Sequence, residues 1–305
     1  MSDEAMSPDE SCTVDTCSLE FSYSSYRPTF LGNLVYAIVF AICLVAQLVY
    51  GFRHRTWGFT AAFFCGLLLE ILGYVGRILM YYNPFKQANF MLYLVPLTIA
   101  PAFLSAGIYL CLARVVVLYA SEGVDISRLK PRTYTLIFVA CDFISLLLQA
   151  AGGAMASMAD TKVSEDTGIH IMVAGLAFQV ASMALFMGLA AEVGFRIVKS
   201  HKTKVNEVTG STLFKRFLIA VVVATVCIFI RCVFRVAELS EGFNGKLANQ
   251  QESFMVLEGL MMALAAIALT VYNPGRGFQG KWAAVNYSFW RSSTPASESE
   301  ADAKA

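Results

Sequence analysis

Charge is scarce in this sequence, and the charges that are present gather in short segments. Of the 305 residues, 57% are hydrophobic and only 15% are charged, and the net charge is +1. Soluble proteins carry roughly 25% charged residues, so most of this chain cannot form a water-exposed globular surface. The nearly neutral balance gives no reason to expect a nucleic acid as partner. Long uncharged stretches indicate segments dissolved in lipid, where an unpaired charge costs at least roughly 3 kcal/mol.

Several kinds of site are also missing. The chain has three histidines without grouped metal-ligand spacing, so we expect neither a metal site nor a cofactor. It has no phosphate-binding loop of the pattern Gly-x-x-x-x-Gly-Lys-Ser/Thr, no Gly-x-Ser-x-Gly, no His-Glu-x-x-His and no paired catalytic aspartates, which argues against an enzyme. Residues 1–26 are acidic and lack the basic start and apolar run of a signal peptide. The first apolar span should therefore act as the insertion signal.

Seven apolar stretches have the roughly 20 residues that cross the hydrocarbon core of a bilayer. They predict an all-α, polytopic membrane protein, a bundle of seven transmembrane helices over residues 29–272. An N-terminal arm (1–28) precedes the bundle, and a tail (273–305), disordered from about residue 292, follows it. The third stretch contains Pro96 and Pro101, which predict a kink or tilt. The seven stretches are Thr29–Tyr50, Gly58–Tyr82, Phe90–Tyr119, Tyr134–Met158, His170–Ala191, Leu213–Ala237 and Ser253–Tyr272.

The distribution of Lys and Arg predicts the orientation. Fifteen of these residues lie in the first, third and fifth loops and the C-terminal tail, whereas only Arg27, Lys86, Lys162 and Lys246 lie on the other side. Cytoplasmic loops carry the excess of positive charge. We therefore expect the C-terminus in the cytosol and, because seven is odd, the N-terminus outside. Asn286-Tyr287-Ser288 fits the glycosylation pattern, but on this topology it is cytosolic and should remain bare.

The cysteines divide into two groups. Cys12 and Cys17 lie in the polar N-terminal arm, where they either form a small extracellular disulfide loop or remain two free thiols. The other six lie in the apolar spans and are expected to be packing residues.

Ionisable and amide side chains recur on one face of several predicted helices. Residues that are four and seven positions apart share a helix face, and each ionisable residue inside a membrane span is a candidate functional residue. The second span has Glu70, Tyr74 and Arg77 at this spacing, and the sixth has Arg231, Arg235 and Glu238. The fourth has Asp142, Ser145 and Gln149, the fifth carries Gln179, and the seventh carries Glu258.

These residues lie at three depths and are expected to line a cavity open to one side of the membrane. Glu70 lies roughly 18 Å into its helix, too deep to reach water, so either its partner is on another helix or it is protonated. Two alternatives are structural. Arg235 and Glu238 could form an ion pair that only holds the sixth helix, and Arg114, near a span end, could extend to the interface.

Tyr26-Arg27-Pro28 precedes the first span, and the polar motifs of the second, fourth and sixth spans follow in order along the chain. With these motifs the sequence resembles the fungal lipid-translocating exporters, seven-span proteins that include sphingoid long-chain-base exporters and aminocholesterol-resistance proteins. The resemblance covers about residues 26–274. The run Ser253–Leu257 has fewer aromatic residues than the family pattern, and Glu258 stands where the family usually has Asp. The motifs that carry the resemblance are Tyr26-Arg27-Pro28, Glu70-Ile-Leu-Gly73-Tyr74-Val-Gly76-Arg77, Ala100-Pro101-Ala102, Ala106-Gly-Ile-Tyr109 with Arg114, Asp142-Phe-Ile-Ser145-Leu-Leu-Leu-Gln149-Ala-Ala-Gly152-Gly153, Gly175-Leu176 with Gln179, Arg231-Cys-Val-Phe-Arg235-Val-Ala-Glu238 and Asn273-Pro274.

The resemblance implies translocation or export of amphipathic lipids at the plasma membrane, and resistance to toxic lipophilic compounds. Expected partners are membrane lipids and a small amphipathic substrate, with a homo-oligomer possible. A seven-helix receptor or lipid sensor is the alternative, although the third span lacks an Asp-Arg-Tyr triplet and the seventh lacks a lysine for retinal. The residues expected to bind or translocate substrate are Glu70, Tyr74, Arg77, Tyr109, Asp142, Gln149, Gln179, Arg231, Arg235, Glu238 and Glu258.

Overall fold

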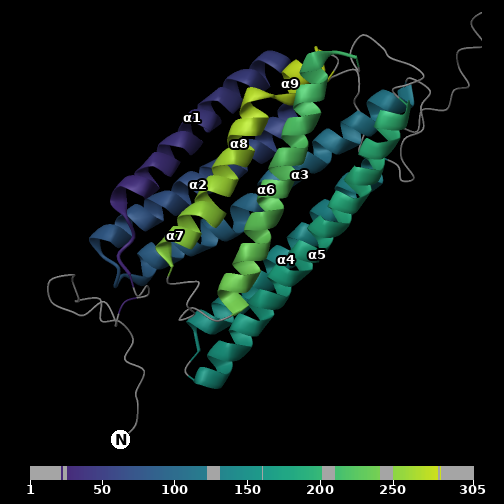
Figure 1. The fold of residues 1–305 in the computed structure, drawn as a ribbon. Helices are drawn as coiled ribbons and strands as arrows, with labels where there is room; N and C mark the ends of the chain where they lie inside the picture. Colours follow the sequence, from purple (N-terminus) through teal and green to yellow (C-terminus); the bar gives the residue numbers. More distant parts are fainter. Residues whose placement is uncertain are drawn as a thin grey trace, which may run out of the picture.

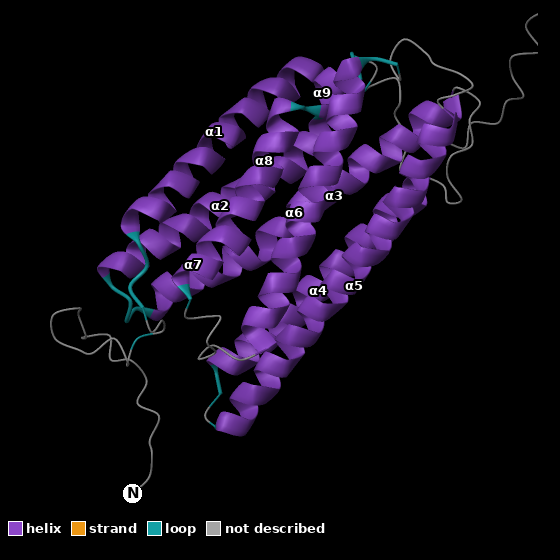
Figure 2. Ribbon diagram, viewed as in Figure 1, coloured by secondary structure: helices purple, strands orange, loops and turns teal. Residues whose placement is uncertain are grey.

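The computed structural model describes Ser22, residues 26–121, 131–159, 161–200, 210–240 and 250–280, and Trp282. These described residues form helices joined by short connections and contain no strand (Figures 1 and 2). The helices are α1 (Phe30–His54), α2 (Trp57–Tyr82), α3 (Gln87–Ser121), α4 (Pro131–Ser157), α5 (Lys162–Ser200), α6 (Thr212–Ser240), α7 (Gln251–Phe254), the π-helix η2 (Met255–Leu260), α8 (Met261–Val271) and α9 (Pro274–Gly277).

Seven helical segments among the described residues are long and apolar enough to cross a membrane, with α7, η2, α8 and α9 together forming the seventh. This confirms the predicted all-helical class and the number of spans. The predicted arm at 1–28, with Cys12 and Cys17, and the tail from about residue 292 lie outside the described residues, apart from Ser22 and the last three positions of the arm. We call the end of the bundle where α1 begins the amino end, and the end where α9 lies the carboxy end.

The largest difference from the predicted spans is in α5, which begins eight residues before His170 and continues nine residues beyond Ala191. The apolar run ends where charged residues begin, but the helix does not. Glu192 and Arg196 pair at 2.7 Å one turn apart, and such pairs support a helix that has left the apolar region. A span predicted from hydropathy is therefore shorter than its helix.

Helices α4 and α5 run side by side along one edge of the bundle, with α3 and α6 between them and the layer formed by α1, α2 and α8 (Figure 1). Glycines bring the backbones of α4 and α5 into contact: a Cβ on Gly152 would lie 2.4 Å from the Met172 amide nitrogen, and one on Gly168 would lie 2.5 Å from that of Ala156. Small residues permit such close approach of membrane helices.

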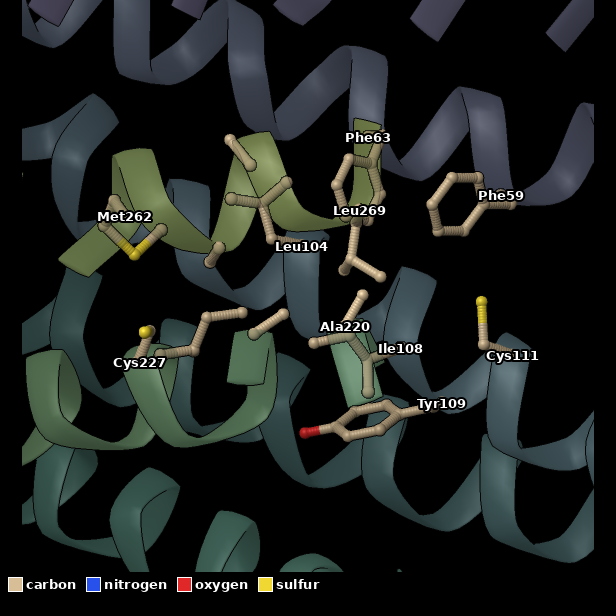
Figure 3. Close-up of a cluster of buried hydrophobic side chains, with 14 of the residues drawn as sticks. Phe59, Phe63, Leu104, Ile108, Tyr109, Cys111, Ala220, Cys227, Met262 and Leu269 are labelled. Atoms are coloured by element: carbon tan, nitrogen blue, oxygen red, sulfur yellow. The ribbon is translucent and has the colours of Figure 1, made fainter. Parts of the chain in front are cut away.

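The apolar core lies where α2, α3, α6 and α8 meet (Figure 3). Phe59 and Phe63 of α2 stack with their ring centroids 4.3 Å apart. Tyr109, from α3, brings a hydroxyl group into this region (Figure 3). The outward faces of the helices are apolar as well. The polar side chains between the helices are therefore candidate functional residues.

Candidate functional site

A buried ion pair joins α6 to the π-helical turn of the seventh span. The Arg231 guanidinium donates two hydrogen bonds to Oε1 of Glu258, 3.0 Å from Nε and 2.7 Å from Nη2. Both side chains are 0% exposed. Glu258 and Gly259 lie within η2, and single π-helical turns inside α-helices often occur at functional sites. The extra residue in this turn sets which side chains of the seventh span face α6.

The same arginine binds α3 through a carbonyl group that a proline leaves available. Nη2 of Arg231 donates to the Leu97 carbonyl oxygen. In an unbroken helix this oxygen would accept from the amide of residue 101, but Pro101 has no N–H group. Both Pro96 and Pro101 lie inside α3, which is a single helix from Gln87 to Ser121. Pro101 thus supplies an acceptor at the depth where Arg231 needs one.

Glu70 and Tyr74 of α2 face this ion pair. Glu70 is 0% exposed and lies within electrostatic range of both Glu258 and Arg231. The Tyr74 hydroxyl lies against Gly259, where an added Cβ would be 2.8 Å from its oxygen. We call Glu70, Tyr74, Arg231 and Glu258 the central polar cluster. Neither Glu70 oxygen accepts a hydrogen bond from a described residue, so a partner on another helix and a protonated Glu70 both stay predictions.

The central polar cluster has more hydrogen-bonding atoms than the described residues satisfy. Both carboxylate oxygens of Glu70, the Tyr74 hydroxyl, Nη1 of Arg231 and Oε2 of Glu258 are buried without a hydrogen-bond partner in the described part of the chain. Each unsatisfied buried group costs about 1–3 kcal/mol, and more if it is charged. Proteins keep few such atoms. The presence of five of them in one cluster makes the central polar cluster the candidate binding site.

Arg77 lies toward the amino end in a cage of aromatic rings. Its guanidinium carbon is 3.8 Å from the ring centroid of Phe254 and 4.9 Å from that of Tyr93. Its Nη2 donates to the Tyr26 hydroxyl at 2.8 Å, and its Nε donates to Oδ1 of Asn33 at 3.2 Å. Cation–π contacts and two hydrogen bonds hold this cation between α1, α2, α3 and α7. Arg77 lies on the same face of α2 as Glu70, but the two side chains interact with different residues.

Arg235 and Glu238 form a separate pair on α6, at 2.6 Å, and both are almost fully buried. Nη2 of Arg235 also donates to the Thr98 hydroxyl of α3 at 3.3 Å. The pair therefore lies inside the bundle and links two helices, which agrees with the structural alternative of an ion pair that holds α6 in place.

The remaining candidate residues lie between α3, α4 and α5. Oδ2 of Asp142 accepts hydrogen bonds from the Ser105 hydroxyl at 2.8 Å and from the Tyr109 hydroxyl at 3.0 Å. The Gln149 amide donates to Oε1 of Gln179 at 3.1 Å. These contacts pair residues from different helices but do not join them to the central polar cluster.

Among the described residues, the eleven candidate side chains do not line a cavity open to one side of the membrane. All eleven candidate residues are buried, and the structure divides them among five groups of contacts. The reason is packing: inside an apolar bundle, a polar side chain forms a hydrogen bond or an ion pair with the nearest complementary group. Within the described residues, no three His, Cys, Asp or Glu side chains are grouped as metal ligands would be.

A cluster at the carboxy end was not predicted from sequence. Arg114 donates to the Trp282 carbonyl oxygen, and its guanidinium carbon lies 4.0 Å from the ring centroid of that residue; that it extends to the interface stays a prediction. Trp282 and Phe278 pack edge to face at 5.2 Å. Asn273 caps α9 and donates to Gln47 of α1 at 2.8 Å. The chain thus remains packed on the bundle beyond residue 272.

Several partners were missed because they carry no charge. Asn33, Thr98 and Ser105 each bind one of the predicted ionisable residues. Asn33 could have been identified from the sequence, because it is an amide within an otherwise apolar first span. Thr98 and Ser105 had none, since hydroxyl residues are common in membrane helices and usually bond to their own backbone.

Comparisons with known proteins agree with these observations. Residues 63–281 match the sequence model of the family described as RTA1 like protein. The chain is 34% identical over 290 residues to the sphingoid long-chain base transporter RSB1 of Saccharomyces cerevisiae, with 85% of this chain and 75% of that one covered. It is 30% identical over 210 residues to protoporphyrin uptake protein 1 of the same yeast, covering 68% of this chain and 66% of that one. It is 28% identical over 278 residues to the yeast protein RTA1, covering 83% and 85%. No solved structure matches the chain.

Proposed function

Because this chain belongs to the RTA1-like protein family, we propose that it translocates amphipathic lipids across a membrane, with sphingoid long-chain bases as its substrate class. The observation that carries this proposal is the central polar cluster, in which two buried carboxylates lie within electrostatic range of each other and three of their four oxygens accept no hydrogen bond from a described residue. A sphingoid base has an ammonium group and a long alkyl chain. The carboxylates of Glu70 and Glu258 are suited to bind the ammonium group, and the apolar helix faces are suited to contact the alkyl chain.

The conformation described above is then an occluded stage of transport. The central polar cluster has no surface exposed to either side, so moving a headgroup through it requires the helices to separate. The groups that hold it closed are the bonds of Arg231 to Glu258 and to the Leu97 carbonyl. Asp142, Tyr109, Gln149 and Gln179 would provide further polar contacts along the path between α3, α4 and α5.

We also propose the orientation and location of the protein. The Lys and Arg distribution favours an N-terminus outside and a C-terminus in the cytosol, and the resemblance to exporters favours outward movement at the plasma membrane.

The predicted orientation leaves Asn286 bare in the cell. Glycan transfer needs the lumenal or external side of the membrane, and Asn286 follows the seventh span. We expect the full-length protein from a eukaryotic host to keep its electrophoretic mobility after glycosidase treatment. The positive control is an Asn-x-Ser/Thr sequence added to the N-terminal arm, which should be glycosylated. A glycan found on Asn286 would contradict the proposed orientation.

The translocation proposal is tested with purified protein in lipid vesicles and a labelled sphingoid long-chain base. Wild-type protein should accelerate movement of the base between leaflets relative to empty vesicles. Glu70→Gln should slow this movement about tenfold to a hundredfold, because a charge-assisted hydrogen bond to the ammonium group contributes about 1.5–3 kcal/mol.

The matched control is Glu252→Gln. Glu252 lies on the same span as Glu258 but is exposed, so this variant should move the base at the wild-type rate. Movement no faster than in empty vesicles would overturn the proposal, and recruitment of a cytosolic partner without lipid movement would favour the receptor alternative.

A further inference from the structure

The central polar cluster is not neutral when its three ionisable side chains are charged. It holds two carboxylates, Glu70 and Glu258, and one guanidinium, Arg231, all 0% exposed. The nearest other arginines are engaged elsewhere, Arg235 with Glu238 and Arg77 in its aromatic cage. A buried charge without a partner is strongly unfavourable. The cluster therefore lacks one positive charge within contact distance, because no hydrogen bond or ion pair among the described residues balances its second carboxylate.

We propose that this additional charge is held on Glu70 and is either a proton or the ammonium group of the substrate, one excluding the other, so that the protein exchanges one proton for each amine that it moves. This proposal rests on the translocation function proposed above. It adds the coupling between proton movement and substrate movement. The Glu70 carboxylate binds either a proton or the ammonium group of the substrate, and it does not bind both at once.

Hydrogen bonding identifies Glu70 as the exchanging group. Oε1 of Glu258 already accepts two N–H groups from Arg231, whereas neither oxygen of Glu70 accepts a hydrogen bond from any described residue. An ammonium group has three N–H donors and no acceptor. The two oxygens of Glu70 together with either the Tyr74 hydroxyl or Oε2 of Glu258 provide three acceptors for it, none of which is bonded to a described residue.

Among the described residues that face Glu70, no other carboxylate is without a hydrogen bond. Tyr74 is adjacent on α2, and the Tyr36 hydroxyl of α1 is occupied by donation to the Met255 carbonyl at 2.7 Å. Helix α3 contributes the Leu97 carbonyl, which Arg231 binds. The titratable and charged groups that face the cluster from the described elements include Tyr36 (α1), Tyr74 and Arg77 (α2), Arg231, Cys232, Arg235 and Glu238 (α6) and Glu258 (η2).

The exchange balances in atoms and charge. When the ammonium group enters, the O–H bond of the Glu70 carboxyl breaks and its proton leaves to the side from which the amine came. When the ammonium group leaves on the opposite side, Glu70 takes a proton from that side. One positive charge moves each way, so the cycle transfers no net charge and is driven by a proton gradient.

The experiment measures proton release when a sphingoid long-chain base binds to the full-length protein in detergent, in weakly buffered solution with a pH indicator. We expect about one proton released for each base bound by the wild type. The N-acetylated base, which has no ammonium group, should release none. This comparison uses the wild type alone and therefore does not depend on any variant folding.

Variants then assign the proton to its residue. Glu70→Gln should bind the base without releasing a proton, and Glu70→Asp should restore release, whereas the exposed Glu252→Gln should behave as the wild type does. In vesicles, acidifying the side toward which the base moves should accelerate movement in the wild type and have no effect in Glu70→Gln.

Two results overturn the proposal. One is base movement that is insensitive to the pH gradient and occurs without proton release, which would leave the translocation function intact. The other is binding that requires sodium and releases no proton, which would assign the additional charge to a metal ion. Absence of any base movement by the wild type would instead remove the translocation function.

Discussion

Replacing Arg231 with methionine is expected to destabilise the protein by about 3–5 kcal/mol, the cost of removing one partner of a buried ion pair. The loss is large because Glu258 would remain 0% exposed without the cation that is bonded to it, and the Leu97 carbonyl would lose its donor at the same time. The measurement is the thermal unfolding midpoint in detergent, supported by the fraction of protein that stays monodisperse.

Two control variants separate charge imbalance from lost packing. The double variant Arg231→Met, Glu258→Met should recover most of the stability, since replacing both partners of a buried pair by apolar groups is often neutral. Arg216→Met changes an arginine on the exposed surface of α6 and should leave the midpoint near that of the wild type. An Arg231→Met protein as stable as the wild type would show that the pair does not hold α6 and the seventh span together.

Replacing Gly152 with alanine is expected to separate α4 from α5. The added Cβ would lie 2.4 Å from the Met172 nitrogen and 2.6 Å from the Gly168 oxygen. Both are backbone atoms, which cannot move aside as a flexible side chain can. Overpacking of this kind costs about 1–3 kcal/mol or more. The readout is the unfolding midpoint together with resistance of the α4–α5 connection to proteolysis.

The matched control is Gly188→Ala on α5. Nothing lies within 4 Å of a Cβ at Gly188, and alanine favours a helix over glycine by about 1 kcal/mol. The two glycine-to-alanine changes should therefore shift the midpoint in opposite directions. Equal shifts would mean that the close contact between α4 and α5 does not contribute to stability.

The residue spacing within each helix predicted which side chains share a buried face. Glu70, Tyr74 and Arg77 are all buried, as are Arg231, Arg235 and Glu238. This succeeded because a helix repeats every 3.6 residues whatever surrounds it, and because lipid excludes polar groups from the outer surface of a span. The number of spans followed from the same two facts.

Partners across helices did not follow from spacing. Glu70 and Arg77 share a face yet belong to different groups of contacts, and Glu258 pairs with Arg231 rather than with Arg235, one turn further along the same face. The π-helical turn at Met255–Leu260 contributes to this choice, because it changes the direction in which Glu258 points. No pattern in the seventh span indicated that turn.

The sequence alone therefore determined the fold class, the seven spans, the inward faces and the family, since each depends on local hydropathy, local spacing or ordered motifs. Only the tertiary structure decided that Glu70 remains unpaired beside an ion pair, that Pro101 supplies a carbonyl group to Arg231, and that Arg114 ends on Trp282. Those outcomes depend on the rotation and crossing of helices distant in sequence. The physical reason is that a buried polar group bonds to whichever complementary atom packing brings within about 3 Å, and packing is a property of the whole bundle.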